Sequence, residues 1–269
     1  MKKCTIVAMM FVLMFGVAIN VYAFGVNVTI PDENYNTSNS WYTEGHEDQE
    51  VEPGMVASQN WDLEAFFFDD ATNALTMVGG YDFKNGEQGN GQLFKSGDIF
   101  IDVNGDAQYG DINGTNGYIT DKNTYGYEYV IDLDFENSKY EVVKLTADSL
   151  TTTAYYYQNE GSSPWKYAGG GTVLSSDNAI TYQTGLTNDE TGLLGGSHNA
   201  VTINLQAILA DLGNSGAYSL ISHFTMQCGN DNLMGKFDPT PPVPEPSTVL
   251  LIGLGLFGIA GISRKRIKK

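Results

Sequence analysis

Oxygen-bearing side chains recur at alternate positions in one short polar segment. Asp102, Asn104 and Asp106 lie two residues apart, and Asp111 follows five residues later. Alternate side chains of a tight turn can converge on one hard cation, as they do in calcium loops. The segment departs from an EF-hand, because Ala107 stands where the sharp-turn glycine belongs and position twelve is not a glutamate. The spacing predicts a calcium site, and the alternative is a plain hairpin turn at the Asn-Gly pair.

Four aromatic side chains flank a turn at residues 158–164. On a predicted strand over residues 151–157, Tyr155 and Tyr157 share one face, and Trp165 and Tyr167 join it across the hairpin. A flat aromatic platform of this kind stacks well on sugar rings. The pattern predicts a carbohydrate-binding surface, and the alternative is ordinary cross-strand packing.

The sequence offers few motifs for catalysis. His46, His198 and His223 are scattered, with neither an HExxH pair nor a GxSxG elbow around them. Asp62 and Glu64 form a carboxylate pair of the kind a glycosidase uses, but on a strand both point the same way without evident partners. We therefore expect a protein that is not an enzyme. The alternative is a secreted enzyme that acts on polysaccharide, such as a lyase or a glycosidase.

The composition limits the class of protein to which the chain can belong. Its 269 residues carry 32 Asp and Glu against 14 Lys and Arg, a net charge of -18. Nucleic-acid binders need a basic surface to displace phosphate counterions, so this excess excludes an ordinary member of that class. Few charged residues (17%) together with 31 glycines and many aromatic residues indicate an exported β protein.

Short apolar or alternating runs separated by turn residues predict an all-β fold, either an antiparallel β-sandwich or a jelly roll. Leu205, Ile208, Leu209 and Leu212 have helical spacing, which allows one short helix that ends at Gly213. The predicted strands are Trp61–Phe68, Leu75–Val78, Gly97–Asp102, Tyr127–Phe135, Tyr140–Leu145, Thr151–Tyr157 and Ser219–Met226. Trp61–Phe68 and Leu75–Val78 form a hairpin, and Tyr127–Phe135 has one buried face.

Residues 1–23 have the pattern of a secretory signal peptide with a helical apolar segment. Lys2 and Lys3 precede an uncharged run, which closes on small residues at the two positions that signal peptidase reads, Val21 and Ala23. Cleavage after Ala23 leaves Phe24 as the new N-terminus. The alternative is a retained anchor, but the run is short for a membrane span.

The other end of the chain has three parts in a fixed order. Residues 239–246 form a proline-rich linker, residues 247–263 form an apolar segment, and residues 264–269 form a basic tail. The apolar segment is just long enough for a transmembrane helix if the basic ends snorkel. The tail, which includes Arg264, Lys265 and Arg266, places the C-terminus in the cytoplasm and the rest of the chain outside.

The residues Pro244, Glu245 and Pro246, followed by the apolar segment and the basic tail, resemble the PEP-CTERM sorting signal. The resemblance covers residues 243–269 and implies a Gram-negative bacterium, processing by a membrane-embedded exosortase, and a destination in the cell envelope or beyond it. It also implies an inner-membrane anchor that lasts only until processing. Exopolysaccharide and biofilm matrix are the surroundings in which such proteins often lie.

The predicted mature chain, residues 24–246, keeps seven lysines and all 32 carboxylates, which gives a net charge of -25. Such a surface repels anionic lipid and polysaccharide unless cations intervene, so multivalent cations are expected partners, and simple solubility is the alternative. We expect one domain over residues 24–238, in which residues 24–58 form a loop-rich acidic edge. Cys228 stands alone there, so no internal disulfide forms, and we expect its thiol to be buried.

Three short segments of this domain, at residues 61–64, 97–102 and 228–231, are similar to segments of PEP-CTERM cargo domains. The first two also resemble carbohydrate-binding and DOMON-like β-sandwiches. Together with the sorting signal, these resemblances imply an exported envelope or matrix protein with a structural or carbohydrate-binding role.

Overall fold

The computed structural model describes residues 24–31, 47–52, 54–108, 115–213 and 218–239. The predicted signal peptide, the sorting motif Pro244-Glu245-Pro246, the apolar segment 247–263 and the basic tail lie outside the described residues, as do Asp111 and part of the acidic edge. Over the described ranges, no helix is long and apolar enough to cross a membrane.

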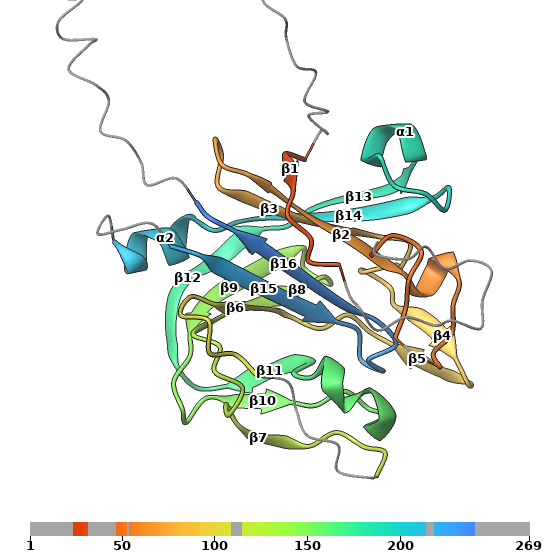
Figure 1. The fold of residues 1–269 in the computed structure, drawn as a ribbon. Helices are drawn as coiled ribbons and strands as arrows, with labels where there is room; N and C mark the ends of the chain where they lie inside the picture. Colours follow the sequence, from red (N-terminus) through yellow and green to blue (C-terminus); the bar gives the residue numbers. More distant parts are fainter. Residues whose placement is uncertain (1–23, 32–46, 53, 109–114, 214–217, 240–269) are drawn as a thin grey trace, which may run out of the picture.

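One antiparallel sheet has five strands in the order β1-β2-β3-β14-β13 (Figure 1). The predicted hairpin is confirmed, because β2 and β3 pair from Phe68 opposite Leu75 to Leu63 opposite Gly79. The other strands pair antiparallel as well. The bounds are β1 Val26–Asn27, β2 Leu63–Asp69, β3 Ala74–Gly79, β13 Thr181–Leu186 and β14 His198–Asn204.

A second antiparallel sheet has six strands in the order β12-β9-β8-β6-β15-β16. Four of them confirm predicted strands, namely β6 Ile99–Asp102, β8 Tyr129–Asp134, β9 Lys139–Lys144 and β15 Leu220–Thr225. The sequence analysis missed β12 Thr172–Ala179, whose side chains are mostly exposed, and β16 Asn232–Phe237.

The two large sheets contribute to one hydrophobic core. Phe68 of β2 stacks on Phe237 of β16 with ring centroids 4.6 Å apart, and Met77 and Val201 of the first sheet join Ile131 of the second in the same cluster. The described residues form mainly β-strands, all of them paired antiparallel, and only short helices, so the all-β class is confirmed.

A smaller antiparallel sheet in the order β11-β10-β7 lies against the other face of the six-stranded sheet. Its strands are β7 Thr120–Lys122, β10 Leu150–Thr152 and β11 Lys166–Gly169. Val130 of β8 and Tyr167 of β11 belong to a second cluster on that face. The expectation that residues 127–135 bury one face only is therefore wrong, because Val130 is fully buried there. A two-stranded hairpin, β4 Glu87–Gly89 and β5 Gln92–Phe94, completes the sheets.

The predicted strand Thr151–Tyr157 is wrong beyond Thr152. The backbone N–H of Tyr155 donates to Gln227 O at 2.9 Å, in the turn after β15, which draws the chain away from the β10 ladder. Two short 3₁₀ turns then span Tyr157–Ser162, with a kink between them at Asn159. Tyr155 and Tyr157 consequently do not share a strand face.

The short helix predicted before Gly213 is confirmed as α2, Gln206–Leu212. Gly213 has φ of 73°, a conformation in which a side chain is strained. The expectation that this domain has a single short helix is wrong, because a second helix, α1, spans Asn188–Thr191. The Glu190 carboxylate accepts hydrogen bonds from the Thr187 backbone N–H and hydroxyl, each at 2.8 Å, which stabilises this single turn.

The N-terminal segment, residues 24–31, forms hydrogen bonds with both large sheets. Val28 donates its backbone N–H to Phe66 O of β2 at 2.9 Å, and its carbonyl accepts from Lys236 N of β16 at 2.8 Å. The Phe24 ring lies 6.0 Å from Phe67, so the chain joins the fold at its first described residue. Gly25 and Asp238 line the same depression, which places both ends of the described chain close together (Figure 1).

Candidate functional site

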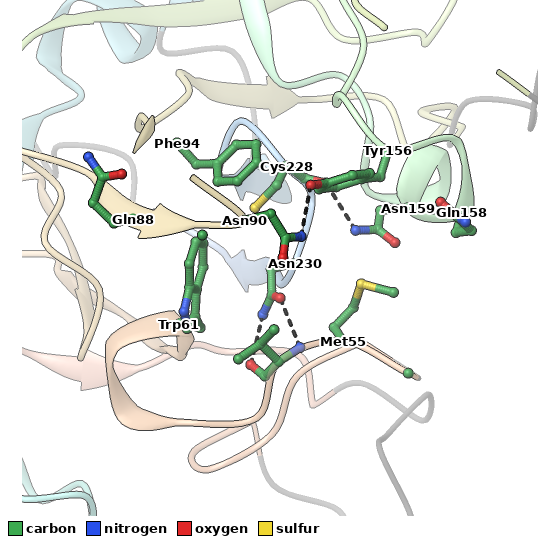
Figure 2. A pocket seen from close by; sticks show the side chains of 13 residues that line it. Met55, Trp61, Gln88, Asn90, Phe94, Tyr156, Gln158, Asn159, Cys228 and Asn230 are labelled. Atoms are coloured by element: carbon green, nitrogen blue, oxygen red, sulfur yellow. Dashed lines mark hydrogen bonds between the residues drawn. The ribbon is translucent and has the colours of Figure 1, made fainter. Parts of the chain in front are cut away.

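A pocket of about 620 Å³ opens beside the β4–β5 hairpin (Figure 2). Four stretches far apart in the sequence form it, namely residues 54–61, the hairpin, residues 156–159 and the turn between β15 and β16. Its aromatic lining consists of Trp61, Phe94 and Tyr156, and its amide lining consists of Gln88, Asn90, Gln158, Asn159 and Asn230.

The aromatic residues of the pocket support one another through ring contacts. Trp61 ends a 3₁₀ turn, and its ring meets the Phe94 ring edge-on with centroids 6.0 Å apart. Tyr156 lies 5.7 Å from Phe94. A side chain at Gly89 would begin 3.0 Å from the Trp61 indole, so this glycine allows the hairpin to lie directly against the ring. These contacts hold the rings in fixed orientations.

Backbone groups orient the amides. Asn230 accepts from Val56 N at 3.0 Å through Oδ1 and donates through Nδ2 to Val56 O at 3.1 Å, which joins the segment 54–56 to the β15–β16 turn (Figure 2). Asn159 donates to Cys228 O at 3.0 Å, and Asn90 donates to the Tyr156 hydroxyl at 3.2 Å. The pocket therefore combines fixed rings with neutral groups that both donate and accept hydrogen bonds.

None of the described residues that line this pocket carries a charge at neutral pH. Cys228 is buried as expected, and burial raises the pKa of its thiol to about 12. A thiol with this pKa stays protonated at neutral pH, so it is a poor nucleophile. The described lining suits binding better than acid–base or nucleophilic chemistry.

Tyr155 and Trp165, two of the four aromatic residues predicted from the sequence, come together near the pocket. Both contact Tyr118, which the sequence analysis missed. Tyr118 lies with its ring 5.2 Å from Tyr155 and 5.4 Å from Trp165, and Tyr155 lies 6.4 Å from Phe94. We call the five rings Phe94, Tyr156, Tyr155, Tyr118 and Trp165 the aromatic belt.

The other two predicted aromatic residues lie outside the aromatic belt. Tyr157 begins the first of the two 3₁₀ turns, and Tyr167 packs into the cluster under the three-stranded sheet. Tyr118, Phe94 and Tyr156 were not among the sequence candidates, because only tertiary contacts bring them to the others.

The predicted calcium loop is closed by its own hydrogen bonds. Asp102 is buried, and its carboxylate accepts from Asn104 N, Gly105 N and Ala107 N at 2.9, 2.7 and 3.0 Å. These bonds are those of a tight Asx-type turn, so the alternative interpretation explains the shape of the loop without an ion.

Glu128 is a member of this acidic loop that the sequence analysis missed, since it lies just before β8. It accepts from Val103 N at 2.9 Å and from the Asn104 amide at 2.7 Å. Oxygen atoms of Asp102, Asp106 and Glu128 lie within 4.8 Å of one another. Burial, followed by repulsion from Asp102 and Asp106, raises the pKa of Glu128.

We expect Asp102→Ala to destabilise the fold by about 3 kcal/mol, because three backbone N–H groups lose a charged acceptor. Asp106→Ala is the matched control, since Asp106 is exposed and its carboxylate accepts none of these three hydrogen bonds. We expect it to change the free energy of unfolding by less than about 0.5 kcal/mol. Urea unfolding in the presence of a chelator measures both, and equal effects would contradict the role given to Asp102.

Residues 242–266 match the PEP-CTERM protein-sorting motif. The chain is thus exported with a C-terminal sorting signal that an exosortase processes. No curated protein and no solved structure is significantly similar to the chain.

Proposed function

We propose that this chain is an exported carbohydrate-binding protein of the bacterial envelope or extracellular matrix, that it binds a neutral glycan, and that it is not an enzyme. The observation that carries the proposal is the pocket beside the β4–β5 hairpin, whose described lining combines aromatic rings and amides without a charged side chain. Its volume of about 620 Å³ lies within the range of small-molecule sites, roughly 300–1,000 Å³.

The chemistry of the lining matches that of a sugar. A sugar ring has an apolar face of C–H groups and a rim of hydroxyls that both donate and accept. Aromatic side chains such as Tyr156 complement the face, and amides such as Asn90 and Gln158 complement the rim. The aromatic belt continues this surface from Tyr156 to Trp165, which supports a chain of several sugars as the ligand.

Charge supports a neutral glycan over an anionic one. The predicted mature chain has a net charge of -25, and no lysine lines the described pocket. Uronic acid or sulfate groups would therefore be repelled over long distances and would find no cation at the site. A neutral polysaccharide meets neither obstacle.

We infer removal of residues 1–23 by signal peptidase, and a transient inner-membrane anchor at residues 247–263 with the C-terminus in the cytoplasm. The shared core of the five- and six-stranded sheets supports a β-sandwich as the architecture of residues 24–238. Calcium at Asp102, Asn104, Asp106 and Asp111 is also part of the proposal, in which Glu128 would add a further oxygen ligand.

A glycan array probed with residues 24–246 tests the function. We expect retention on neutral glycans and at least about tenfold weaker binding after Tyr156→Ala, which corresponds to about 1.4 kcal/mol. Tyr157→Ala is the matched control, because the neighbouring tyrosine is outside the pocket lining and is expected to leave binding unchanged.

A reducing-end assay on the bound glycans separates binding from catalysis. Retention without new reducing ends supports a binding protein, whereas their release would favour the lyase or glycosidase alternative. Equal affinities of the parent and Tyr156→Ala would contradict the pocket as the site.

A further inference from the structure

A second group of acidic residues lies in the interior, where the segment 47–52 meets the start of β2. Asp62 and Glu64 are two residues apart, so their side chains point to the same side of the chain. Oxygen atoms of these two and of Asp48 lie within 4.8 Å of one another. The Asp62 side chain is fully buried and Glu64 is 1% exposed. We call Asp48, Asp62 and Glu64 the buried triad.

One imidazole faces the buried triad. His198 Nδ1 lies 2.6 Å from Glu64 Oε2, and its Nε2 lies 3.0 Å from Asn188 Oδ1. That Asn188 oxygen also accepts from Gly196 N, so both ring nitrogens of His198 lie against side-chain oxygen atoms. The described acidic groups around this imidazole, Asp48, Asp62 and Glu64, outnumber the one basic side chain.

Asp62 has an oxygen that the described protein leaves unsatisfied. Its Oδ2 accepts from Gln49 N at 3.2 Å, whereas the buried Oδ1 has no hydrogen-bond partner. Gln59, which donates to Glu64 Oε1, also has a buried amide oxygen without a partner. Buried polar atoms of this kind are costly unless an ion or a water satisfies them, and both of these are oxygen acceptors suited to a cation.

We propose that Asp48, Asp62 and Glu64 bind a calcium ion. A divalent cation offsets the mutual repulsion of this acidic group, and carboxylate and amide oxygens are the ligands that a hard cation prefers. Calcium–oxygen distances are about 2.3–2.6 Å, so oxygens up to about 4.8 Å apart can lie on opposite sides of one calcium ion. Magnesium needs shorter distances and near-octahedral geometry, and it binds less well to such a set.

The electrostatics of neighbouring groups agree with this assignment. Burial, followed by repulsion from Glu64 and Asp48, raises the pKa of Asp62 well above its usual value. Asp231 accepts from Leu63 N at 2.6 Å, and burial together with the charges of Asp62 and Glu50 raises its pKa as well. A bound cation relieves the repulsion among these carboxylates.

The site has a consequence for the proposed pocket, although the metal proposal does not depend on a glycan. The segment that supplies Asp48 continues through Glu52, whose N–H donates to Asn230 O at 3.3 Å, to Met55 and Val56 in the pocket wall. Calcium at the buried triad therefore fixes the segment that forms one wall of the pocket.

Calorimetric titration of the chelator-stripped full-length chain in detergent, with calcium chloride and no glycan, tests the proposal. We expect calcium to bind and to raise the melting temperature by about 5–10 °C at a hundredfold excess over the dissociation constant. Asp62→Asn keeps the shape of the side chain and removes one charge. We expect this variant to lose one bound calcium, and to melt at a higher temperature than the parent when no metal is present.

Asp106→Asn is the matched control, because it removes a carboxylate from the other acidic group and is expected to leave the calcium site of the buried triad intact. Should Asp62→Asn fail to fold, Glu64→Gln provides the same comparison. Absence of calcium binding by the parent would overturn the proposal, and so would an unchanged calcium stoichiometry in a folded variant of the buried triad. A carboxylate with only a structural role would instead give a metal-free variant that melts below the parent.

Discussion

Replacement of Asp98 by alanine is expected to remove about 3–6 kcal/mol of stability, a large part of the 5–15 kcal/mol typical of a folded protein. The Asp98 carboxylate is fully buried and joins two sheets. It accepts from Leu133 N of β8 at 3.0 Å and from Tyr167 N of β11 at 2.8 Å, and Lys166 Nζ lies 3.7 Å away. Alanine leaves two backbone donors without their acceptor in a place that water does not reach.

Chemical denaturation of the purified chain measures this loss. Asp132→Ala is the matched control, since Asp132 lies on the neighbouring strand β8 near the same lysine and its carboxylate accepts neither of these bonds. We expect this control to cost less than about 1 kcal/mol. Comparable losses from the two substitutions would show that Asp98 does not hold the sheets together.

The pH dependence gives an independent check on Asp98. Burial raises its pKa to about 6, although Lys166 acts in the opposite direction. Because the folded-state pKa exceeds the unfolded one, this group stabilises the fold fully below about pH 4, and the contribution falls as the pH rises to about 6. The difference in unfolding free energy between the parent and Asp98→Ala should shrink over that interval by roughly 3 kcal/mol.

Loss of the basic tail is expected to block processing of the chain almost completely. In the topology proposed above, residues 264–269 hold the C-terminus in the cytoplasm by the positive-inside rule, and without them the apolar segment has no signal that retains it in the membrane. Alanines in place of Pro244, Glu245 and Pro246 should have the same effect, because these residues lie in the stretch that matches the sorting motif. In both variants we expect the unprocessed, larger form to accumulate at the inner membrane.

Immunoblots of fractionated cells follow this processing. Alanines at Pro239 and Pro241 are the matched control, because these prolines belong to the same linker but precede the matched residues 242–266. That control should be processed like the parent. Normal processing and release of both motif variants would argue against recognition by an exosortase.

The strands with a clear apolar pattern could be predicted from the sequence, and the others could not. In β2, β6 and β15 nearly every side chain is buried, so the sequence shows a short apolar run. In β12 and β13 most side chains are exposed or half-exposed, and these strands are held by pairing with β9 and β14. Backbone pairing has no residue pattern, so the sequence does not predict such strands.

The sites were predictable only where their residues are neighbours in the sequence. The spacing of Asp102 and Asp106 identified one acidic loop. Glu128 was not predicted to belong to it, because it lies just before β8 and meets the loop only through the pairing of β8 with β6. Asp62 and Glu64 were noticed as a pair without partners, although His198, 134 residues from Glu64, lies against it. Tertiary contacts between distant segments form both the pocket and the buried triad, and no local spacing indicates them.

The position of the two chain ends determines how the protein faces its surroundings. β1 and the C-terminal end of β16 lie at one end of the fold, and β7, β10 and β11 lie at the opposite end (Figure 1). If the proposed anchor at residues 247–263 holds the chain at the inner membrane, β16 leads toward the membrane and β7, β10 and β11 lie at the end of the fold farther from it. Processing within residues 242–266 leaves the surface formed by these three strands unchanged.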